Sequence, residues 1–498
     1  MRCQQTYVRW FHVWALTLML GAFASSAYAQ TYNNNNNTNN TNNTNNTNNS
    51  NTNNGSSYIS GVAGVFLDAQ GTVQQFRRVD RTGQLSRQQL QATLMSLSED
   101  VAKPSRMRYV SLTALERKLA RNGGVITDEM RHLAGLVRLT HVFAFPESKE
   151  LVIAGPAEGW VPGPDGMDVG YHSGLPTLEL QDLVVALRAF PADGNTTPMV
   201  GCSIDPTEQG LANFQQYVNR VSGRLPKSQE EENQLLNGMI DSLGFHDISV
   251  YGVPANTHFA QILVAADYRM KLIGLGLENP PVKMVKYVDK ATPASMARNA
   301  LVRWYFVPDY DCVRISEDGL GMELVGLGLK LVGEDEVVSS AGVRTVVKKQ
   351  GNSASEAFQK SFTQNYPQIA KTTPVYAQLR NITDMLIAAA YLQKEDLYTK
   401  CDWNMEFLGS EENFAVQNCK APEKAISAVA AVWKQNKLMT PIAGGVKIEP
   451  QTAFDAETTT EEQNAQIIQA RNTVELKLAD GKWWWDQAVE EPVGKKKK

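Results

Sequence analysis

The chain has 498 residues, of which 43% are hydrophobic and 20% are charged, and its formal net charge at pH 7 is -4. This composition is typical of a globular protein and excludes a chain that is wholly disordered or embedded in a membrane. The small negative charge provides no general attraction to nucleic acid or anionic lipid, and we interpret the one basic run, Lys495–Lys498, as a solvated terminus. The length allows about three domains.

The first 30 residues have the pattern of a secretory signal peptide, residues 1–29. Arg2 and Arg9 precede the apolar run 13–23, which is short for a bilayer span, and small residues at 27–29 precede a cleavage site. We expect export to the periplasm, the cell surface or the medium, with cleavage before Gln30. No later apolar run approaches the roughly 20 residues of a spanning helix, so no transmembrane segment is expected after cleavage. An uncleaved anchor is the alternative.

Residues 30–56 form a spacer rich in Asn and Thr. The segment 33–54 contains no apolar residue, so we expect disorder, because nothing in it could offset the entropy lost on ordering. It also contains Asn-x-Thr/Ser sequons. In a eukaryotic secretory pathway the spacer would be a glycosylated stalk, whereas in a bacterium it would be a plain polar spacer.

Residues 57–190 are predicted to form an α+β region. It begins with a strand, a Gly-containing turn and a second strand over 64–76, and another hairpin is expected from strands at 139–146 and 150–161. A helix over 178–190 has the apolar repeat of an amphipathic helix. Three more segments have helical spacing behind Ser or Thr caps: 86–98, 111–120 and 127–137.

A linker at 191–198 precedes a second α+β region, residues 198–350. It starts with a short apolar strand. Asp205 is the expected N-cap of the next helix, because Glu208 lies at the position that completes a capping box. Gly223 is expected to end this helix.

The same signals predict a second helix, with Ser228 as its cap and Gly244 at its end. An alternating strand follows over 245–253. Aromatic and β-branched residues then predict several strands between Leu301 and Val338.

A long helix is predicted between these strands, capped by Asn256 or Thr257. One face carries apolar residues for about four turns: Phe259, Ile262, Leu263, Ala266, Met270 and Ile273. The same stretch contains four ionisable residues: His258, Asp267, Arg269 and Lys271. We interpret it as a core helix rather than a catalytic site. Asp267 and Lys271 are expected to form a surface pair worth a few tenths of a kcal/mol, and Arg269 to cover the next layer or bind an acid elsewhere.

Residues 353–440 are predicted to be mainly helical. Thr373 and Pro374 begin a helix with one apolar stripe: Val375, Leu379, Ile382 and Leu386. A second stripe, Ile426, Val429 and Trp433, predicts another helix. The tail, residues 441–498, is expected to contain a Trp-rich hairpin that turns at Asp480-Gly481, with Trp484 docked on the globule.

Export changes how the cysteines are interpreted. Cys3 leaves with the signal peptide, so the mature chain keeps four. We expect a disulfide between Cys401 and Cys419, which flank one loop-rich stretch, and by elimination another between Cys202 and Cys312. Free buried thiols are the alternative.

No motif predicts a metal or a cofactor. The histidines of the mature chain stand in no metal-binding spacing, and no glycine-rich phosphate loop or nucleophile elbow is found. Acidic turns at 308–311, 316–319 and 333–336 are better explained as turn residues than as Ca²⁺ ligands.

One nucleophile candidate remains. Cys202 lies just before a predicted helix N-terminus, where the helix dipole can lower the pKa of a thiol, and His246 or His258 could lie close to it in the fold. A disulfide partner or a small buried residue is the simpler explanation for Cys202 in an exported protein.

Four stretches carry a resemblance to a known family: "GCSIDPTEQGLANFQQY", "VPANTHFAQILVAADYRMKLIGLGLENPPVKMVKYVD", "RWYFVPDYDCVRISEDGLGMELVG" and "YPQIAKTTPVYAQLRNITDMLIAAA". Over roughly residues 61–390 the sequence resembles exported planctomycete proteins that are known only as a domain of unknown function. The resemblance implies a bacterial host and therefore no glycosylation of the spacer. It implies no catalytic residues.

The sequence therefore predicts an exported α+β protein that binds or scaffolds a partner in the cell envelope or at the cell surface, without enzymatic activity. The absence of a catalytic motif and a spacer suited to holding a globule away from its neighbours favour this hypothesis. The alternative is an exported hydrolase or thiol enzyme that uses Cys202 with His246 or His258.

Overall fold

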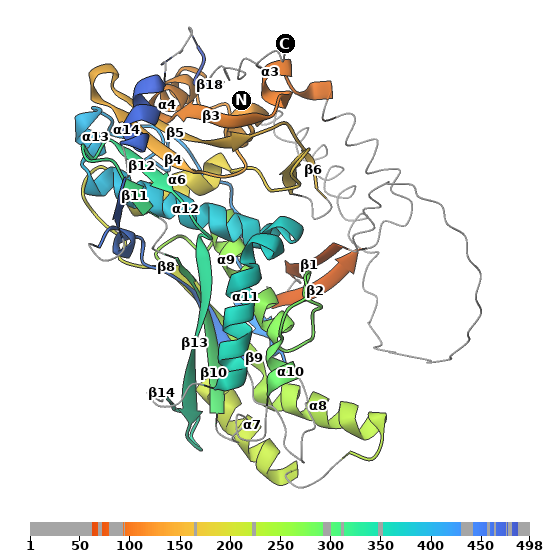
Figure 1. The fold of residues 1–498 in the computed structure, drawn as a ribbon. Helices are drawn as coiled ribbons and strands as arrows, with labels where there is room; N and C mark the ends of the chain where they lie inside the picture. The colour runs from red at the N-terminus through yellow and green to blue at the C-terminus, as the bar shows by residue number, and fades with distance from the viewer. Residues whose placement is uncertain are drawn as a thin grey trace, which may run out of the picture. The chain divides into compact units, whose positions relative to one another are not determined.

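Two large β-sheets organise the computed structural model of the chain (Figure 1). All the described residues belong to one compact unit, Ser60–Lys498. The predicted signal peptide and Asn/Thr spacer lie outside the described residues. The structure describes residues 62–67, 72–78, 93, 95–163, 167–221, 226–291, 300–309, 313–346, 352–429, 442–455, 459–462, 465–474, 476 and 481–486.

The first sheet, sheet A, has nine strands and is mixed. β15 runs parallel to β2 and β10 runs parallel to β16, whereas the other neighbours are antiparallel. Its strands, in spatial order, are β1 (Val62–Leu67), β2 (Thr72–Arg78), β15 (Lys424–Ile426), β9 (Phe245–Tyr251), β8 (Val200–Pro206), β16 (Ile442–Ile448), β10 (Ala300–Pro308), β13 (Leu329–Val338) and β14 (Arg344–Val346).

The second sheet, sheet B, has seven strands. Their spatial order is β17 (Thr460–Glu461), β11 (Val313–Ile315), β12 (Gly321–Leu324), β4 (His141–Phe145), β5 (Glu150–Ala157), β3 (Ser105–Ser111) and β18 (Trp484–Asp486). A separate small hairpin is formed by β6 (Trp160–Pro162) and β7 (Asp168–Gly170).

Helices pack on both sheets. The longer ones are α4 (Leu112–Arg121), α6 (Leu180–Ala189), α7 (Glu208–Val221), α8 (Gln229–Leu243), α9 (His258–Gly274), α11 (Ser353–Thr372), α12 (Pro374–Lys394) and α14 (Gln466–Thr473). The short ones are α3 (Glu99–Ala102), α5 (Asp128–Arg131), α10 (Tyr287–Lys290), α13 (Leu397–Lys400) and the 3₁₀ turns η1 (Leu133–Gly135), η2 (Pro146–Ser148) and η4 (Pro450–Phe454).

The two faces of sheet A pack against different helices. Successive side chains of a strand point to opposite faces, so Trp304 and Leu301 of β10 lie on opposite sides. Trp304 packs against Phe358 of α11 and donates from its indole Nε1 to Ser355 Oγ at 2.9 Å. Leu301 belongs instead to the small core formed with α7 and α8. Figure 1 shows α11 running along β13 and β10, and α7 and α8 at the far end of the sheet.

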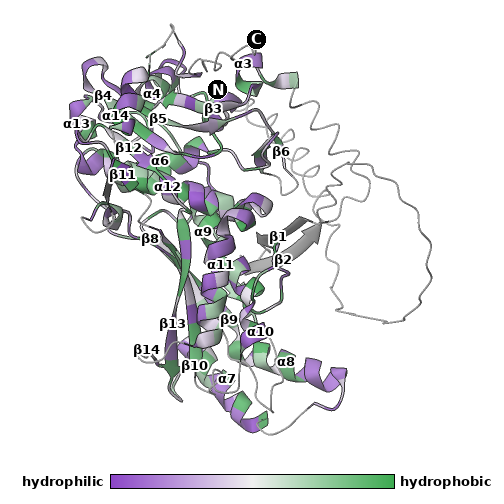
Figure 2. Ribbon diagram, viewed as in Figure 1, coloured by the Kyte–Doolittle hydropathy of each residue, from purple (hydrophilic) through white to green (hydrophobic). Residues whose placement is uncertain are grey.

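Helix α12 lies at the centre of the molecule. It contacts α6, α9 and α11, and every residue from Val375 to Leu392 is buried. A helix that is buried on all sides must be surrounded by other elements. The main hydrophobic core is accordingly continuous from sheet A through α9 and α12 to sheet B. Helix α8 differs from the buried α12, because one end of α8 is hydrophilic (Figure 2).

The α+β fold class predicted from the sequence is confirmed. The predicted helices at 111–120, 178–190 and 228–244 and the helix after Thr373 are present, and so are the strands between Leu301 and Val338. The predicted helix 127–137 is shortened to α5 and η1, and most of the predicted helix 86–98 lies outside the described residues. Sheet A, however, draws strands from all four of the consecutive regions outlined by sequence: β1 from 57–190, β8 from 198–350, β15 from 353–440 and β16 from 441–498.

The start of α7 differs from the prediction. β8 continues to Pro206, and the helix is capped by Thr207, whose Oγ1 accepts from Gly210 N at 2.9 Å. Asp205 does not cap the helix. Its Oδ1 instead forms ion pairs with Arg303 Nη2 at 3.0 Å and Arg344 Nη1 at 3.3 Å. The predicted end at Gly223 lies outside the described residues.

The helix predicted from Ile426, Val429 and Trp433 is not present at Ile426. Ile426 ends β15, which pairs with both β9 and β2. Pairing with two distant strands outweighs the local helical spacing. Trp433 lies outside the described residues.

The Trp-rich tail is part of sheet B. β18 pairs with β3, whereas much of the predicted partner strand in the tail lies outside the described residues. Trp485 stacks on Tyr109 with ring centroids 5.5 Å apart. Trp484 faces the other way, is buried, and packs against the Arg108 guanidinium at 4.6 Å, so its predicted docking on the globule is observed.

The predicted disulfide between Cys401 and Cys419 is not formed. Cys401 is a free thiol beside β5, with its Sγ 3.6 Å from Glu150 O. Cys419 is also a free thiol. It lies in a loop beside the start of α9, where its backbone N donates to Asn256 O at 2.9 Å. Cys202 is free and buried, so the pair assigned to it by elimination is not seen either, and Cys312 lies outside the described residues.

Candidate functional site

Helix α9 crosses sheet A and carries the ionisable residues noted in the sequence. Thr257 caps it, with its Oγ1 accepting from Ala260 N at 3.2 Å, as predicted. All six residues of the predicted apolar stripe are buried. Because the helix lies between sheet A and α12, its other faces are buried as well, and the ionisable side chains had to find partners inside the protein.

Asp267 and Lys271 form a buried ion pair rather than the surface pair that was expected. Lys271 Nζ lies 2.8 Å from Asp267 Oδ2 and donates to Ile204 O at 3.0 Å. Lys271 is 2% exposed and Asp267 is 0% exposed. Burial raises the pKa of Asp267 to about 6, although the Lys271 charge pulls it down. The pair is therefore a core element whose members depend on each other.

Arg269 binds the carboxylate of Glu278, which confirms one of its two predicted alternatives. Its Nη2 donates to Glu278 Oε1 at 2.7 Å, and both residues are buried. Glu278 follows α9 directly, so this ion pair fixes the chain where the helix ends.

His258 lies in the first turn of α9 and pairs with Asp182 of α6. Its Nδ1 is 2.8 Å from Asp182 Oδ2. Burial lowers the pKa of His258, but the negative charge of Asp182 and its hydrogen bond outweigh that effect and raise the pKa to about 9. His258 is therefore a cation at neutral pH that joins two helices.

A second histidine lies at the same end of α6. His132 Nδ1 is 3.1 Å from Glu179 Oε1, and its Nε2 is 3.2 Å from Asp168 Oδ2. Burial lowers its pKa, and the hydrogen bonds to Asp168 and Glu179 raise it more strongly, to about 9. Neither histidine has a free nitrogen lone pair for general-base chemistry at neutral pH.

A hollow opens beside the start of α9, where the pairing of β9 with β15 ends. In that antiparallel ladder Ala425 faces His246, and Ile248 N donates to Glu423 O at 2.9 Å. The register would next place Ala421 opposite Val250. Ala421 N donates to Ala255 O at 2.8 Å instead, so the two segments separate at Pro422.

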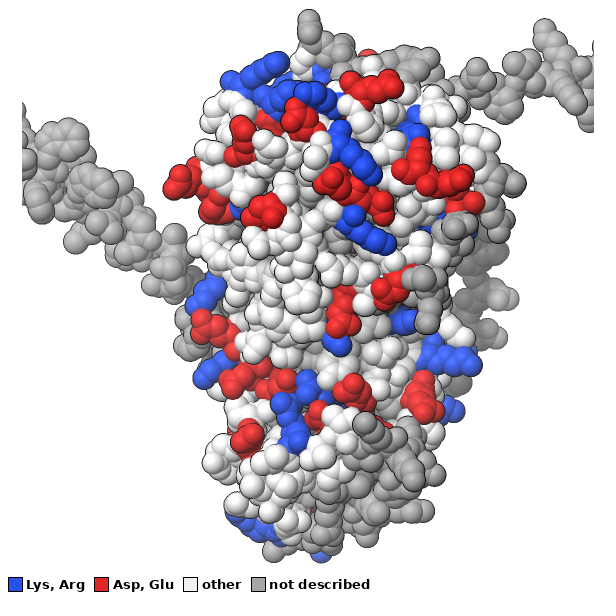
Figure 3. All heavy atoms as spheres, turned by 90° about the vertical axis from the view of Figure 1, so that its left-hand side faces the viewer, with Lys and Arg blue, Asp and Glu red and all other residues white. Residues whose placement is uncertain are grey.

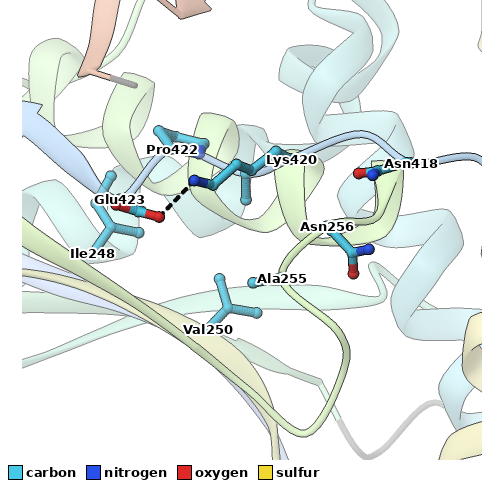
Figure 4. A pocket seen from close by; sticks show the side chains of 9 residues that line it. Ile248, Val250, Ala255, Asn256, Asn418, Lys420, Pro422 and Glu423 are labelled. Atoms are coloured by element: carbon cyan, nitrogen blue, oxygen red, sulfur yellow. Dashed lines mark ion pairs between the residues drawn. The ribbon is translucent and has the colours of Figure 1, made fainter. Parts of the chain in front are cut away.

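The hollow has a volume of about 380 Å³, at the low end of the roughly 300–1,000 Å³ typical of small-ligand sites. Ile248 and Val250 line its floor, and Asn256 and Asn418 stand at one side (Figure 4). Lys420 and Glu423 pair across its edge at 2.7 Å. The lining therefore combines an aliphatic floor with side-chain amides, which both donate and accept hydrogen bonds.

Cys419 lies in the chain between Asn418 and Lys420, two residues that line this hollow, but it is not itself a lining residue. Burial raises the pKa of its thiol, and the negative charge of Asp182 raises it further. A thiol with a raised pKa holds little thiolate at neutral pH, so Cys419 is poorly suited to nucleophilic catalysis.

The residues that the sequence suggested for a thiol enzyme are not brought together by hydrogen bonds within the described structure. Cys202 faces the core, and burial raises the pKa of its thiol well above the usual range. His246 is buried on β9, where burial and then the charges of Lys271 and Arg344 lower its pKa to about 3. His258 is engaged with Asp182.

Sequence reasoning missed the far wall of the hollow. Asn418 and Lys420 come from a stretch with no regular periodicity, and Asp182, the partner of His258, was not singled out from the predicted helix 178–190. Pro422 was the one local signal, because a proline cannot donate to a strand ladder and often marks the end of pairing.

The described residues contain neither a metal-binding cluster nor a membrane-spanning helix. No group of three or more His, Cys, Asp or Glu side chains there is arranged to hold a metal ion. No described helix is long and apolar enough to cross a membrane. Figure 3 shows acidic and basic side chains intermixed on the described part of one face.

Residues 202–287 match the sequence model of a family described as "Protein of unknown function (DUF1598)". The match supports the expected relation to a domain of unknown function. It covers β8, α7, α8, β9 and α9, so the floor of the hollow and Asn256 lie inside it, whereas Asn418 and Lys420 do not. No curated protein and no solved structure matches the chain.

Proposed function

We propose that the protein is an exported binding protein without enzymatic activity, and that the hollow between β9 and residues 418–423 takes an extended peptide segment. The observation that carries this proposal is the break in the β9 ladder at Pro422. An open strand edge beside a lined hollow is the arrangement that proteins use to add a peptide as a further strand.

The backbone of Val250 supports a peptide as the ligand. Backbone groups of a strand point to alternate sides with a period of two. Ile248 N points toward Glu423, so the N–H and C=O of Val250 point the same way, into the hollow. Among the described residues, neither group has a backbone partner on that side. An extended peptide could satisfy both.

The side chains around the hollow suit the same ligand. Asn256 and Asn418 are exposed, and no described residue hydrogen-bonds to either side chain, so both amides are available to peptide groups. Ile248 and Val250 offer an aliphatic floor for alternate side chains of the ligand. The nearby ionisable groups favour binding over catalysis, because the Cys419 thiol has a raised pKa and His258 is held by Asp182.

Export is the second part of the proposal. It is supported by the basic, apolar and small-residue segments within residues 1–29. In a planctomycete or another bacterium, the spacer at 30–56 would hold the peptide-binding unit away from its point of attachment. N-terminal sequencing of protein recovered from cell fractions tests this part. A chain beginning at Gln30 outside the cytoplasm is expected, and an intact Met1 in the cytoplasm would refute export.

A library of acetylated and amidated pentapeptides, screened by fluorescence polarisation against the mature protein, tests the peptide site. Val250→Pro removes the outward N–H without removing a bond to β8, and such a proline is tolerated at an open edge. Loss of one hydrogen bond predicts a several-fold weaker affinity, and the double variant Asn256→Ala/Asn418→Ala should bind more weakly still.

Asn237→Ala is the matched control, because Asn237 is exposed on α8, away from the hollow. It should bind the selected peptides like the native protein. If no peptide binds at millimolar concentration, or if Val250→Pro and the double variant bind as well as the control, the peptide site is refuted.

A further inference from the structure

Arg380, in the middle of α12, is a buried arginine whose Nε has no hydrogen-bond acceptor among the described residues. It is 8% exposed, and its Nε is buried with no hydrogen-bond partner. Within the described residues it makes no ion pair. Arginine stays charged in proteins and carries five N–H donors, and burying such a group without acceptors is strongly unfavourable. The unsatisfied Nε is therefore a donor that a bound anion could satisfy.

A second arginine and only one carboxylate share the location. Arg138 Nε lies 3.4 Å from Asp384 Oδ2, and Asp384 is one helical turn after Arg380 on α12. Burial lowers the pKa of Arg380, and the charge of Arg138 lowers it further, which shows that the two cations repel each other. Two guanidinium groups and one carboxylate leave one positive charge uncompensated.

A glycine turn packs against Arg380, and Arg138 beside it is partly exposed. Gly328 lies against the stem of Arg380, because a Cβ there would be 2.8 Å from Arg380 Cγ, and its φ is +87°. Gly326, in the same turn, is exposed. The Arg138 side chain is 21% exposed, so the cluster reaches solvent on the side of Arg138.

We propose that Arg138 and Arg380 bind a small oxyanion, a carboxylate or phosphate group, beneath the Gly326–Gly328 turn. The guanidinium group presents parallel N–H donors whose geometry matches two oxygens of one carboxylate or phosphate. A single negative charge neutralises the cluster and satisfies the donors of Arg380. This site is separate from the hollow at β9, and it does not depend on the peptide proposal.

The test measures thermal unfolding of the mature protein in sodium phosphate, sodium acetate and sodium chloride at equal ionic strength and pH 7. A ligand that binds only the folded state raises the melting temperature. Phosphate or acetate should raise it above the value in chloride, and isothermal titration should give one anion per chain. The phosphate and acetate arms distinguish a tetrahedral from a planar ligand.

Variants assign the binding to these residues. Arg380→Met should weaken anion binding roughly tenfold to a hundredfold, the range for lost charge-assisted hydrogen bonds. Asp384→Asn should strengthen binding several-fold, because it removes the competing carboxylate, and simple loss of stability could not produce that gain. Arg121→Met changes an exposed arginine and is the matched control.

Three results would overturn the proposal. The first is equal melting temperatures in all three salts. The second is anion binding by Arg380→Met that equals binding by Arg121→Met. The third is anion binding by Asp384→Asn that is weaker, not stronger, than binding by the native protein. This variant keeps the proposal testable if Arg380→Met does not fold.

Discussion

Arg108 on β3 and Asp486 on β18, 378 residues apart in the chain, form a two-pronged ion pair. Nε and Nη2 of the fully buried arginine each lie 2.9 Å from one carboxylate oxygen. Arg108 also donates to the carbonyl oxygen of Ala134 at 2.6 Å and lies over the Trp484 ring. This contact attaches the end of the described chain to sheet B.

Removing the carboxylate should therefore detach the tail. Asp486→Ala leaves a buried guanidinium short of an acceptor, and we expect a loss of about 3 kcal/mol in the free energy of unfolding, measured by urea denaturation. Glu99→Ala breaks an exposed ion pair with Lys103 and should change stability by less than about 1 kcal/mol. Equal effects of the two substitutions would show that Asp486 does not anchor the tail.

The two histidines near the start of α6 predict a stability that falls at alkaline pH. His132 and His258 have pKa values of about 9 in the folded protein, against about 6.5 in an unfolded chain. Their contribution is therefore complete below pH 6.5 and is lost as the pH rises through 9. A shift of this size corresponds to at most about 3 kcal/mol for each histidine.

Urea denaturation between pH 6 and 10 measures this loss. His258→Gln should flatten the pH dependence, because it removes one of the two groups. His172→Gln, at an exposed histidine, should leave the curve unchanged. A native protein with the same stability at pH 6 and pH 9.5 would contradict the prediction.

The Asp267–Lys271 pair predicts a pH-dependent effect of substitution. Lys271→Met leaves a buried carboxylate alone and should lower stability by about 3 kcal/mol at pH 8. Burial already raises the pKa of Asp267 to about 6, and losing the Lys271 charge raises it further. The carboxyl group can then bind a proton at pH 5, so the loss should be smaller there.

The double variant Asp267→Asn/Lys271→Met separates charge from packing. It has no ionisable group at this position, so its stability relative to the native protein should rise modestly from pH 5 to pH 8, because only the native protein then loses the Asp267 proton that the raised pKa retains. If Lys271→Met shows the same loss at both pH values, the buried pair is not an electrostatic unit.

The thiols predict a graded reactivity. Burial raises the pKa of Cys202 well above its usual range and that of Cys401 to about 11, whereas Cys419 is partly exposed. Iodoacetamide at neutral pH should modify Cys419 slowly in the native protein and leave Cys202 and Cys401 intact, as read by peptide mass mapping. All three should react after denaturation without reductant. A peptide linking Cys401 to Cys419, or fast labelling of native Cys202, would contradict this structure.

Much of the local structure was predictable because its causes lie within a few residues. The cap at Thr257 and the apolar stripe of α9 depend on backbone groups and side chains one or two turns apart. The cap at Ser228 and the strand after Gly244 have the same origin. Even so, the cap assigned to Asp205 was wrong, because Arg303 and Arg344 from distant strands recruit its carboxylate.

By itself, then, the sequence determined the class of fold, the register of α9 and the caps of α4, α5, α8 and α9, since these follow from short-range periodicity and hydrogen bonding. Only the tertiary structure decided that Asp267 and Lys271 are buried, because the burial comes from sheet A and α12 closing around the helix. The tertiary structure also formed the hollow beside Val250 and placed Arg138 near Arg380. Both are formed by segments far apart in the chain, and contact across such separations depends on how the sheets and helices pack.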